Sequence, residues 1–361
     1  MKNARSPCWE AAPGVHVKIE IGGGGGGENP KPKEPELKIG VGVLARDEQN
    51  TITEWVAHYK LLGFDRIIIC DNMSNPSIYN TLNDANIDLL NGVEIMRSPC
   101  EMPDQKWAAE YLISSNTDLD WLLLCDADEF LDLRQEGTIK QYLQQFSDDV
   151  ATIIINWVCH GTSGLQTFDT TKLAMEQFLK RENYDFWWNR FTKPFVRPNL
   201  INLKENAVVN NNIHIIHNDD YLINDAYQKT ISLSTKECQS EIGAIDHNVD
   251  RNLNDLTPLV LRHYMTLDHE SMEKKRIRNC KAGWCCGNNG MSEDNMFNLD
   301  HNGNVVKDLD APGLRYSMEW YNNFCRWGNG RKSCPGGCFK DNIFDDRMKN
   351  VYAQSIRNIL Y

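Results

Sequence analysis

A continuous apolar run followed directly by acidic residues constrains this chain most strongly. Residues 121–125 read WLLLC, and the acids Asp126, Asp128 and Glu129 follow within four positions. A short apolar run without polar alternation is typical of a central β-strand that is covered on both faces. Carboxylates clustered at the end of such a strand do not all stay ionised near a low-dielectric interior unless a positive charge compensates them. The run therefore predicts a buried strand with a bound cation at its carboxyl end.

The first ordered part of the chain predicts a β-α-β unit. Residues 38–45 alternate as in a strand, 51–62 carry apolar side chains at helical spacing, and 66–70 form a second, β-branched strand. Gly63 is suited to ending the helix between them. A strand, a helix and a strand in about 35 residues indicate a parallel sheet with a right-handed crossover.

Acidic and amide side chains recur where the predicted strands end. They are Asp47 with Glu48, Asp71 with Asn72, and the Asp126–Asp128 motif. In parallel α/β sheets, ligands bind at the carboxyl ends of the strands. These residues therefore predict one ligand site along a single edge of the sheet.

The rest of the chain predicts further α/β units and then a less regular part. The expected elements are helices over 77–90 and 105–114, and strands over 93–96, 151–158, 195–198 and 213–217. We expect a flexible Gly/Pro-rich leader over 1–37, one domain in two halves over 38–160 and 161–280, and an irregular C-terminal appendage over 281–361 that is rich in Cys, Gly and Asn.

Composition narrows the possible partners. The net charge is -12, from 38 basic and 50 acidic residues, which disfavours nucleic acid or an anionic membrane as a partner. No apolar stretch approaches the roughly 18 residues of a membrane span, and the N-terminus lacks the apolar core of a signal peptide. We therefore expect a cytoplasmic protein without an integral membrane segment, in the host cytoplasm if the source is viral.

Eight of the twelve cysteines fall into two groups. Cys70 and Cys125 end apolar runs and are expected to be small core residues. The second group lies toward the C-terminus and comprises Cys280, Cys285, Cys286, Cys325, Cys334 and Cys338. Their spacing leaves free thiols, disulfides and a metal site open, with free thiols favoured because cytosolic disulfides are rare.

The Asp-x-Asp motif fits a divalent metal that bridges two phosphates. Hard oxygen ligands select Mg²⁺ or Mn²⁺. We expect Asp128 to be the direct ligand, and Asp126 to contact a ribose or, through water, the metal. Glu129 is expected to point elsewhere and to brace the loop.

Six segments together resemble the family 2-like and family 92 group of glycosyltransferases. In chain order they read ARDEQNTITEWVAHYKLLGFDRIIICDNMS, WLLLCDADEFLDL, WVCHGTSG, LAMEQF, TKPFVRP and LRHYMTLDHESMEKKR. The resemblance covers roughly residues 38–278. It implies a GT-A type fold, with a Rossmann-like, mostly parallel sheet flanked by helices, a nucleotide-sugar half, and a mixed lobe for the acceptor. It also implies transfer of a sugar from a nucleotide-sugar, by default a UDP-sugar, to a glycan or glycoconjugate hydroxyl, usually with inversion and with Mn²⁺ or Mg²⁺.

The resemblance assigns the donor and metal residues. Arg46 and Glu48 would line the nucleotide pocket, and Asp71 would bind the base or ribose. Asp126 and Asp128 match the metal motif. A neutral imidazole is an acceptable ligand for Mn²⁺, and His263 would complete the metal or diphosphate site.

The resemblance also assigns two catalytic residues. Glu176 would take the proton of the acceptor hydroxyl, and Lys193 would face the diphosphate. MEQF replaces the more usual Glu-Arg-Phe, which removes an expected charge partner of Glu176. Asp169 and Glu182 are competing acids in the same region.

Several of these residues have plain structural alternatives. Asp71 would cap the turn that follows it, His263 would be a core histidine, Glu176 a helix-surface acid, and Lys193 a solvated side chain. Of His214 and His217 one is expected to point inward, and Trp187 with Trp188 either stacks on an acceptor sugar or fills the core.

Other functions compare less well with the sequence. A nucleotidyltransferase usually has a Gly-rich, basic first loop, and ARDEQN is neither. A phosphatase of the haloacid dehalogenase type carries Asp-x-Asp after its first strand, whereas here the motif comes later. A catalytically inactive relative that acts as a carbohydrate-binding or scaffold protein stays open, because a metal motif proves neither donor binding nor turnover.

Overall fold

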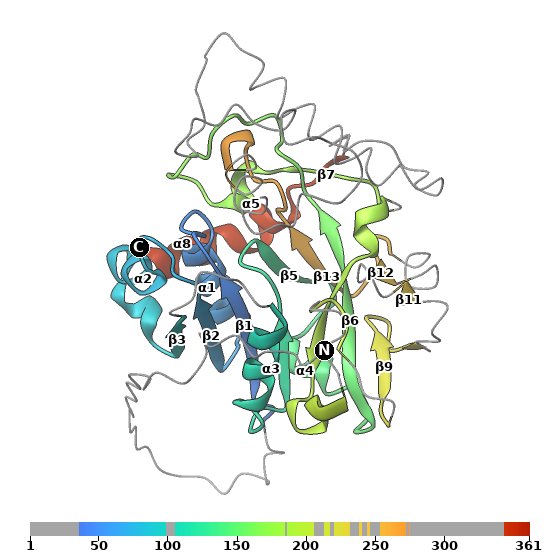
Figure 1. Cartoon of the computed structure of the whole chain (residues 1–361). Coiled ribbons are helices and arrows are strands. Elements are labelled where there is room, and N and C mark those ends of the chain that lie inside the picture. Colours follow the sequence, from blue (N-terminus) through green and yellow to red (C-terminus); the bar gives the residue numbers. More distant parts are fainter. Residues whose placement is uncertain are drawn as a thin grey trace, which may run out of the picture.

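The computed structural model describes residues 36–98, 105–184, 186–205, 213–216, 220–231, 253–271 and 343–361, with short pieces at 238–239, 244–245 and 274. Within these ranges the chain forms an α/β fold built on one large mixed sheet (Figure 1). Its main path runs in the order β10-β9-β6-β8-β4-β1-β2-β3. The strands are β1 (Ile39–Ala45), β2 (Arg66–Asp71), β3 (Val93–Arg97), β4 (Trp121–Leu124), β6 (Val150–Cys159), β8 (Thr192–Val196), β9 (Leu222–Asp225) and β10 (Thr230–Ile231).

The first half of the sheet is parallel, as the β-α-β pattern predicts. β1 pairs in parallel with both β2 and β4, and β2 pairs in parallel with β3. All four residues of β4 are buried, which confirms the expectation of a central strand for the WLLL run. β8 lies antiparallel between β4 and β6, so the sheet becomes mixed in its second half.

The helices largely follow the predicted ranges. They are α1 (Ile52–Leu61), α2 (Ile78–Ala85), the 3₁₀ turn η2 (Ile87–Leu90), α3 (Gln105–Ser114), α4 (Ile139–Leu143) and α5 (Ala174–Gln177). The predicted helix over 77–90 is wrong at its centre, because Asn86 is extended and its side chain accepts the amide hydrogen of Asp88. Asn side chains compete with the helix in this way by offering the backbone another partner.

Two strands next to the acidic motif are absent from the prediction. β5 (Glu129–Leu133) begins directly after Asp128 and pairs antiparallel with β13 (Leu259–His263). β13 also pairs in parallel with β6. The predicted strand over 213–217 is not present in its described part, 213–216, and the one over 195–198 ends at Val196, where Pro198 opens a 3₁₀ turn.

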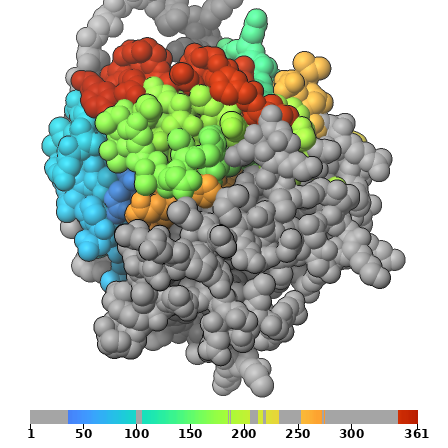
Figure 2. Space-filling model, turned by 90° about the horizontal axis from the view of Figure 1, so that it is seen from above, coloured from blue at the N-terminus to red at the C-terminus, as the bar shows by residue number. Residues whose placement is uncertain are grey.

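The C-terminal residues belong to the main core. The π-helical turn η8 (Lys349–Ala353) continues into α8 (Gln354–Leu360), which packs beside α1 (Figure 1). Tyr352, Ile356 and Leu360 are buried in the same core cluster as the central sheet. Seen from above, this red segment lies along the light-green middle part of the chain (Figure 2). Of the range 281–361 that was expected to form an appendage, residues 343–361 thus pack into the main core, while 281–342 lie outside the described residues.

The described cysteines are buried thiols. Cys70 and Cys125 lie in the core as expected, and Cys159 joins them. The C-terminal cysteines lie outside the described residues, so their state stays a prediction. Among the helices of the described ranges, none combines the length and the apolarity that a membrane crossing requires.

Candidate active site

The Asp-x-Asp motif forms the turn between β4 and β5. The amide of Glu129 donates to the carbonyl of Asp126 at 3.1 Å, and the Glu129 carboxylate accepts the amide hydrogen of Asp126 at 2.8 Å. The predicted bracing role of Glu129 is thus confirmed. The expectation that its side chain points elsewhere is wrong, because its other oxygen lies 3.8 Å from Nζ of Lys193. The turn leaves the Asp126 side chain 32% exposed, while that of Asp128 is buried.

Strand pairing brings His263 to this turn from the other end of the domain. His263 lies opposite Glu129 in the β13–β5 ladder, and the amide of Tyr264 donates to the Asp128 carbonyl at 2.9 Å. The Nε2 atom of His263 is 3.5 Å from Oδ1 of Asp128, and its Nδ1 is 4.0 Å from Oε1 of Glu129. The imidazole packs on Trp157, with 4.3 Å between the ring centroids.

Lys193 reaches the same turn from β8. Because β8 runs antiparallel to β4, its first residues lie beside the carboxyl end of β4, from which the motif emerges. The Nζ atom of Lys193 is 2.7 Å from Oδ2 of Asp126 and 3.8 Å from Oε1 of Glu129. The side chain is 1% exposed and lies 5.8 Å from the Trp157 ring centroid. Lys193 is therefore a buried ion-pair partner and not a solvated side chain.

The charges in this cluster shift one another's pKa values. Burial opposes the ionisation of Asp126, but the Lys193 ammonium outweighs it and holds the pKa of Asp126 below its usual value. Burial would lower the pKa of Lys193, yet Asp126 and Glu129 raise it to about 12. Burial raises the pKa of Glu129 well above its usual value. The cluster thus holds Asp126 and Lys193 as a charged pair.

Two nearby groups support the cluster without joining it. The Nδ1 atom of His214 is 2.8 Å from the Thr192 carbonyl, and burial together with the Lys193 charge lowers the pKa of His214 to about 3. His214 is therefore the neutral, inward-pointing histidine. Trp188 stacks on Phe191 at 5.0 Å between centroids and packs against the core, which favours its packing role; the Trp187 side chain lies outside the described residues.

The predicted metal ligands are brought together in part. Carboxylate and imidazole are suitable donors for Mn²⁺, and Asp128 and His263 converge within 3.5 Å. Over the residues that the structure describes, no three His, Cys, Asp or Glu side chains form a ready-made metal cage. Mg²⁺ and similar ions are usually held by one or two carboxylates together with substrate phosphates and water. The pair fits an ion that shares its coordination with a substrate, while Asp126 is engaged by Lys193.

The predicted nucleotide residues lie in two loops that are tied together. The amide of Asp47 donates to Oγ of Ser74, and the amide of Asn75 donates to Asp47, both at 3.0 Å. Arg46 and Glu48 flank Asp47 in the loop after β1, with Arg46 Nε 3.8 Å from the Asp47 carboxylate. Both loops follow the carboxyl ends of β1 and β2, but nucleotide binding by Arg46 and Glu48 stays a prediction.

Asp71 has the structural role that the sequence offered as its alternative. Its two carboxylate oxygens accept the amide hydrogens of Ser74 at 2.8 Å and Ile78 at 3.2 Å, so it caps the turn and the start of α2. The side chain is buried. A role in binding base or ribose stays a prediction.

Glu176 lies on α5, and its hydrogen bonds and ion pair join it to groups outside the Asp126 cluster. Its carboxylate accepts the Leu173 amide hydrogen at 2.9 Å and pairs with Arg357 of α8 at 2.5 and 2.8 Å. The charge partner that the MEQF segment does not supply is provided by Arg357, 181 residues further along the chain. Its role as catalytic base stays a prediction.

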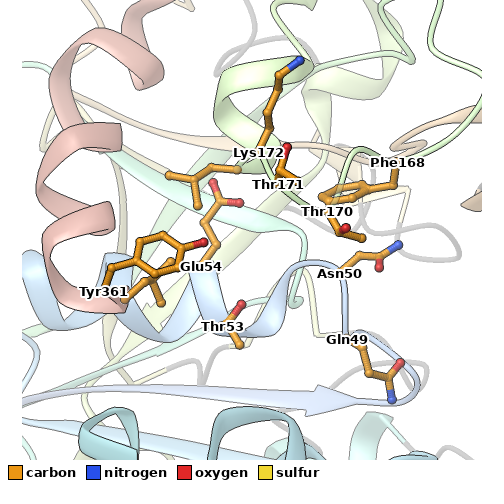
Figure 3. A pocket seen from close by; sticks show the side chains of 11 residues that line it. Gln49, Asn50, Thr53, Glu54, Phe168, Thr170, Thr171, Lys172 and Tyr361 are labelled. Atoms are coloured by element: carbon orange, nitrogen blue, oxygen red, sulfur yellow. The ribbon is translucent and has the colours of Figure 1, made fainter. Parts of the chain in front are cut away.

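A pocket of about 120 Å³ lies apart from the acidic motif, between the start of α1, the segment before α5 and the chain end (Figure 3). It is lined by Gln49, Asn50, Thr53, Glu54, Phe168, Thr170, Thr171, Lys172, Leu173, Leu360 and Tyr361. None of its lining residues belongs to the Asp126, Asp128, Lys193 and His263 cluster. This pocket is therefore separate from the candidate active site.

We expect the buried carboxylate of Glu54, which lines this pocket, to make the free energy of unfolding depend on pH. The carboxylate is 2% exposed, accepts amide hydrogens from Ala174 and Met175, and faces Glu176 and Arg357. Burial raises the pKa of Glu54 from 4.5 to about 8. Between these values the folded chain holds a proton that the unfolded chain has released, so the free energy of unfolding falls as pH rises, by up to about 1.4 kcal/mol per pH unit.

We expect Glu54→Gln to remove this contribution. Its free energy of unfolding relative to wild type should increase between pH 5 and pH 8, measured by urea unfolding at several pH values. Glu94→Gln, at a carboxylate that is 59% exposed, is the matched control and should follow the wild-type profile. Parallel profiles for Glu54→Gln and wild type would show that Glu54 titrates normally.

Comparisons with known proteins add three structures of low similarity. No protein family matches the sequence, and no curated protein is similar to it. GalNAc-T7 with UDP, GalNAc and Mn²⁺ is 16% identical at a TM-score of 0.26, with 35% of this chain and 23% of that chain covered. Glucosyl-3-phosphoglycerate synthase of Mycobacterium tuberculosis with Mn²⁺, UDP and glucosyl-3-phosphoglycerate is 14% identical at 0.24, with coverage of 34% and 44%.

The third structure spans more of the chain. S. aureus TarS, residues 1–349, is 14% identical at a TM-score of 0.33, with 80% of each chain covered. This chain covers less than half of the length of the first two structures. At such identities and TM-scores these similarities carry no functional argument. The class of protein is therefore defined by the fold and the site: an α/β protein with a carboxylate, imidazole and ammonium cluster at the carboxyl edge of a mainly parallel sheet.

Proposed function

We propose that this chain is a metal-dependent glycosyltransferase of the GT-A type, related to the family 2-like group. It would transfer a sugar, with inversion, from a nucleotide-sugar to a hydroxyl of a glycan or glycoconjugate, with a UDP-sugar as the default donor. One observation carries the proposal: Asp126, Asp128, His263 and Lys193 meet at the end of β4, although three separate parts of the chain supply them. This edge of a parallel sheet is where α/β proteins bind nucleotides.

Different residues of the cluster would hold the metal ion and contact the diphosphate. Asp128 and His263 would hold the Mn²⁺ or Mg²⁺, and a bound divalent ion stabilises negative charge that develops on a departing phosphate. Lys193 adds a fixed positive charge in a buried site, where such a charge acts more strongly than in water. The tied loops after β1 and β2, which contain Arg46, Glu48 and Asp71, would form the nucleotide side of the pocket.

The proton of the acceptor hydroxyl needs a base. Glu176 is assigned this role by its sequence context. In the structure its carboxylate is held by Arg357, and although burial raises the pKa of Glu176, the Arg357 contact lowers it below the usual value. A base of low pKa accepts a proton poorly near neutral pH. The proposal therefore requires the Glu176 side chain to leave Arg357 when an acceptor binds.

A nucleotide panel tests the proposed function. The thermal midpoint of the wild-type chain is measured with UDP, GDP, CDP and their sugar conjugates, each with Mn²⁺ and with EDTA. We expect one nucleotide to raise the midpoint by about 2 °C or more with Mn²⁺ and to have no effect with EDTA, because a ligand that binds only the folded state stabilises it. If no nucleotide changes the midpoint under either condition, the proposal fails and an inactive, carbohydrate-binding relative becomes the better reading.

A further inference from the structure

The two aspartate side chains of the Asp-x-Asp motif have different partners. The carboxylate of Asp126 pairs with the Lys193 ammonium at 2.7 Å, whereas that of Asp128 faces the His263 imidazole at 3.5 Å. In a metal site that uses both aspartates, both carboxylates would face the ion. Here the chain itself places a positive charge on one of them.

Lys193 is built into this position. Its side chain is 1% exposed, and its strand is fixed on both sides, by β4 and by β6. Trp157 lies beneath the ammonium, and Glu129 is on its other side at 3.8 Å. In the protein without substrate, this enclosure holds the ammonium beside the Asp126 carboxylate.

A lysine and a divalent cation repel each other strongly at such short range. The Coulomb energy scales with the product of the charges and inversely with their distance, and it is larger in a buried site than in water. A cation that approaches Asp126 therefore meets an ammonium that already occupies this carboxylate. The same cation at Asp128 and His263 meets a carboxylate and an imidazole, whereas the ammonium is paired with Asp126.

We propose that Lys193 is an internal counter-cation that competes with the divalent metal for Asp126. The free protein then binds the metal weakly, through Asp128 and His263. Full affinity appears only when an anionic diphosphate draws the Lys193 ammonium away and leaves Asp126 available. This inference rests on the proposed function for its diphosphate, but the competition itself concerns only the metal and the chain.

Mn²⁺ binding without nucleotide tests the competition. The free Mn²⁺ signal is measured by electron paramagnetic resonance during titration of the wild type, Lys193→Met and Lys140→Met. Lys140 is the matched control, since it also pairs with carboxylates, those of Glu36 and Asp65, but outside the cluster. We expect Lys193→Met to bind Mn²⁺ at least about tenfold more tightly than wild type, because a neighbouring positive charge is removed, and Lys140→Met to match wild type.

A second substitution locates the effect. Adding Asp126→Asn to Lys193→Met should abolish the gain if Asp126 is the carboxylate for which the two cations compete. Lys193→Gln is the alternative where Lys193→Met does not fold, because the amide keeps a hydrogen-bond donor for Asp126 without the charge. Unchanged Mn²⁺ affinity in the folded lysine variants, or a gain that persists with Asp126→Asn, would overturn the inference.

The outcome is separable from that of the nucleotide panel. Tighter Mn²⁺ binding by Lys193→Met without any nucleotide effect would support the competition and reject the donor site. A metal-dependent nucleotide effect with unchanged Mn²⁺ affinity in Lys193→Met would support the proposed function and reject the competition.

Discussion

Asp132→Asn is expected to lower the free energy of unfolding by about 3–5 kcal/mol, the usual loss when one partner of a buried ion pair is removed. Asp132 lies on β5 with a fully buried carboxylate. It accepts hydrogen bonds from Arg262 at 3.0 Å, from Arg134 at 3.2 Å and from Arg347 at 3.0 Å. Asparagine has nearly the same shape but no charge, so the substitution leaves three guanidinium groups around a neutral amide.

The loss of stability in Asp132→Asn would also show how residues 343–361 are held on the domain. Arg347 comes from the C-terminal segment, and Asp345 beside it pairs with Arg262 and Arg181, both at 2.6 Å. Asp132 therefore joins β5, β13 and residues 343–361 through one set of charges. Its pKa is lowered because the three arginines outweigh the effect of burial, so acid should weaken the cluster as the pH falls below the usual carboxyl range.

The control for Asp132→Asn is an exposed ion pair of the same type. Asp118, 54% exposed, pairs with Arg66 at 2.9 Å, and Asp118→Asn should cost less than about 1 kcal/mol. Both variants are compared with wild type by urea unfolding. Equal losses for the two would contradict the assignment of the buried cluster as a major source of stability.

The second large effect is expected at Asp128. Asp128→Asn should lower Mn²⁺ affinity by at least about 100-fold, since even residues that only orient a metal ligand commonly contribute 10–100-fold. The metal-dependent nucleotide effect should disappear with it. Folding stability should not fall, because the substitution removes one of three neighbouring acids, Asp126, Asp128 and Glu129, and so relieves repulsion among them.

Asp148→Asn is the matched control for this variant. Its carboxylate is fully exposed and pairs with Arg197 at 3.6 Å, outside the cluster, so the substitution should change neither metal binding nor the nucleotide effect. Mn²⁺ binding is measured by titration, and the nucleotide effect by thermal midpoint. An Asp128→Asn variant that keeps a metal-dependent midpoint shift would remove Asp128 from the metal site.

The parallel half of the sheet was predictable because its signals are local. The spacing of apolar residues gave α1 and α3 within a residue or two, and the apolar run gave β4. β5 and β13 were missed for the opposite reason. Each is five residues long. β5 becomes a strand by pairing with β13, about 130 residues away in the chain, and β13 by pairing with both β5 and β6.

The site shows the same division. Sequence context predicted Asp126, Asp128, Lys193 and His263, and the structure brings these four together. The sequence could not predict that Lys193 would pair with Asp126, because this contact depends on the position of β8 between β4 and β6 in the sheet. No local sequence pattern could predict that Arg357 is the ion-pair partner of Glu176.

The sequence by itself determined the α/β class, the buried central strand and the position of the acidic motif at its carboxyl end. These follow from periodicity, burial of apolar side chains and the geometry of parallel strands, which act over a few residues at a time. Only the tertiary structure decided that one aspartate faces a lysine and the other a histidine, and that residues 343–361 complete the main core. Such contacts join segments that are far apart in the chain, and their geometry is set by the packing of the whole domain.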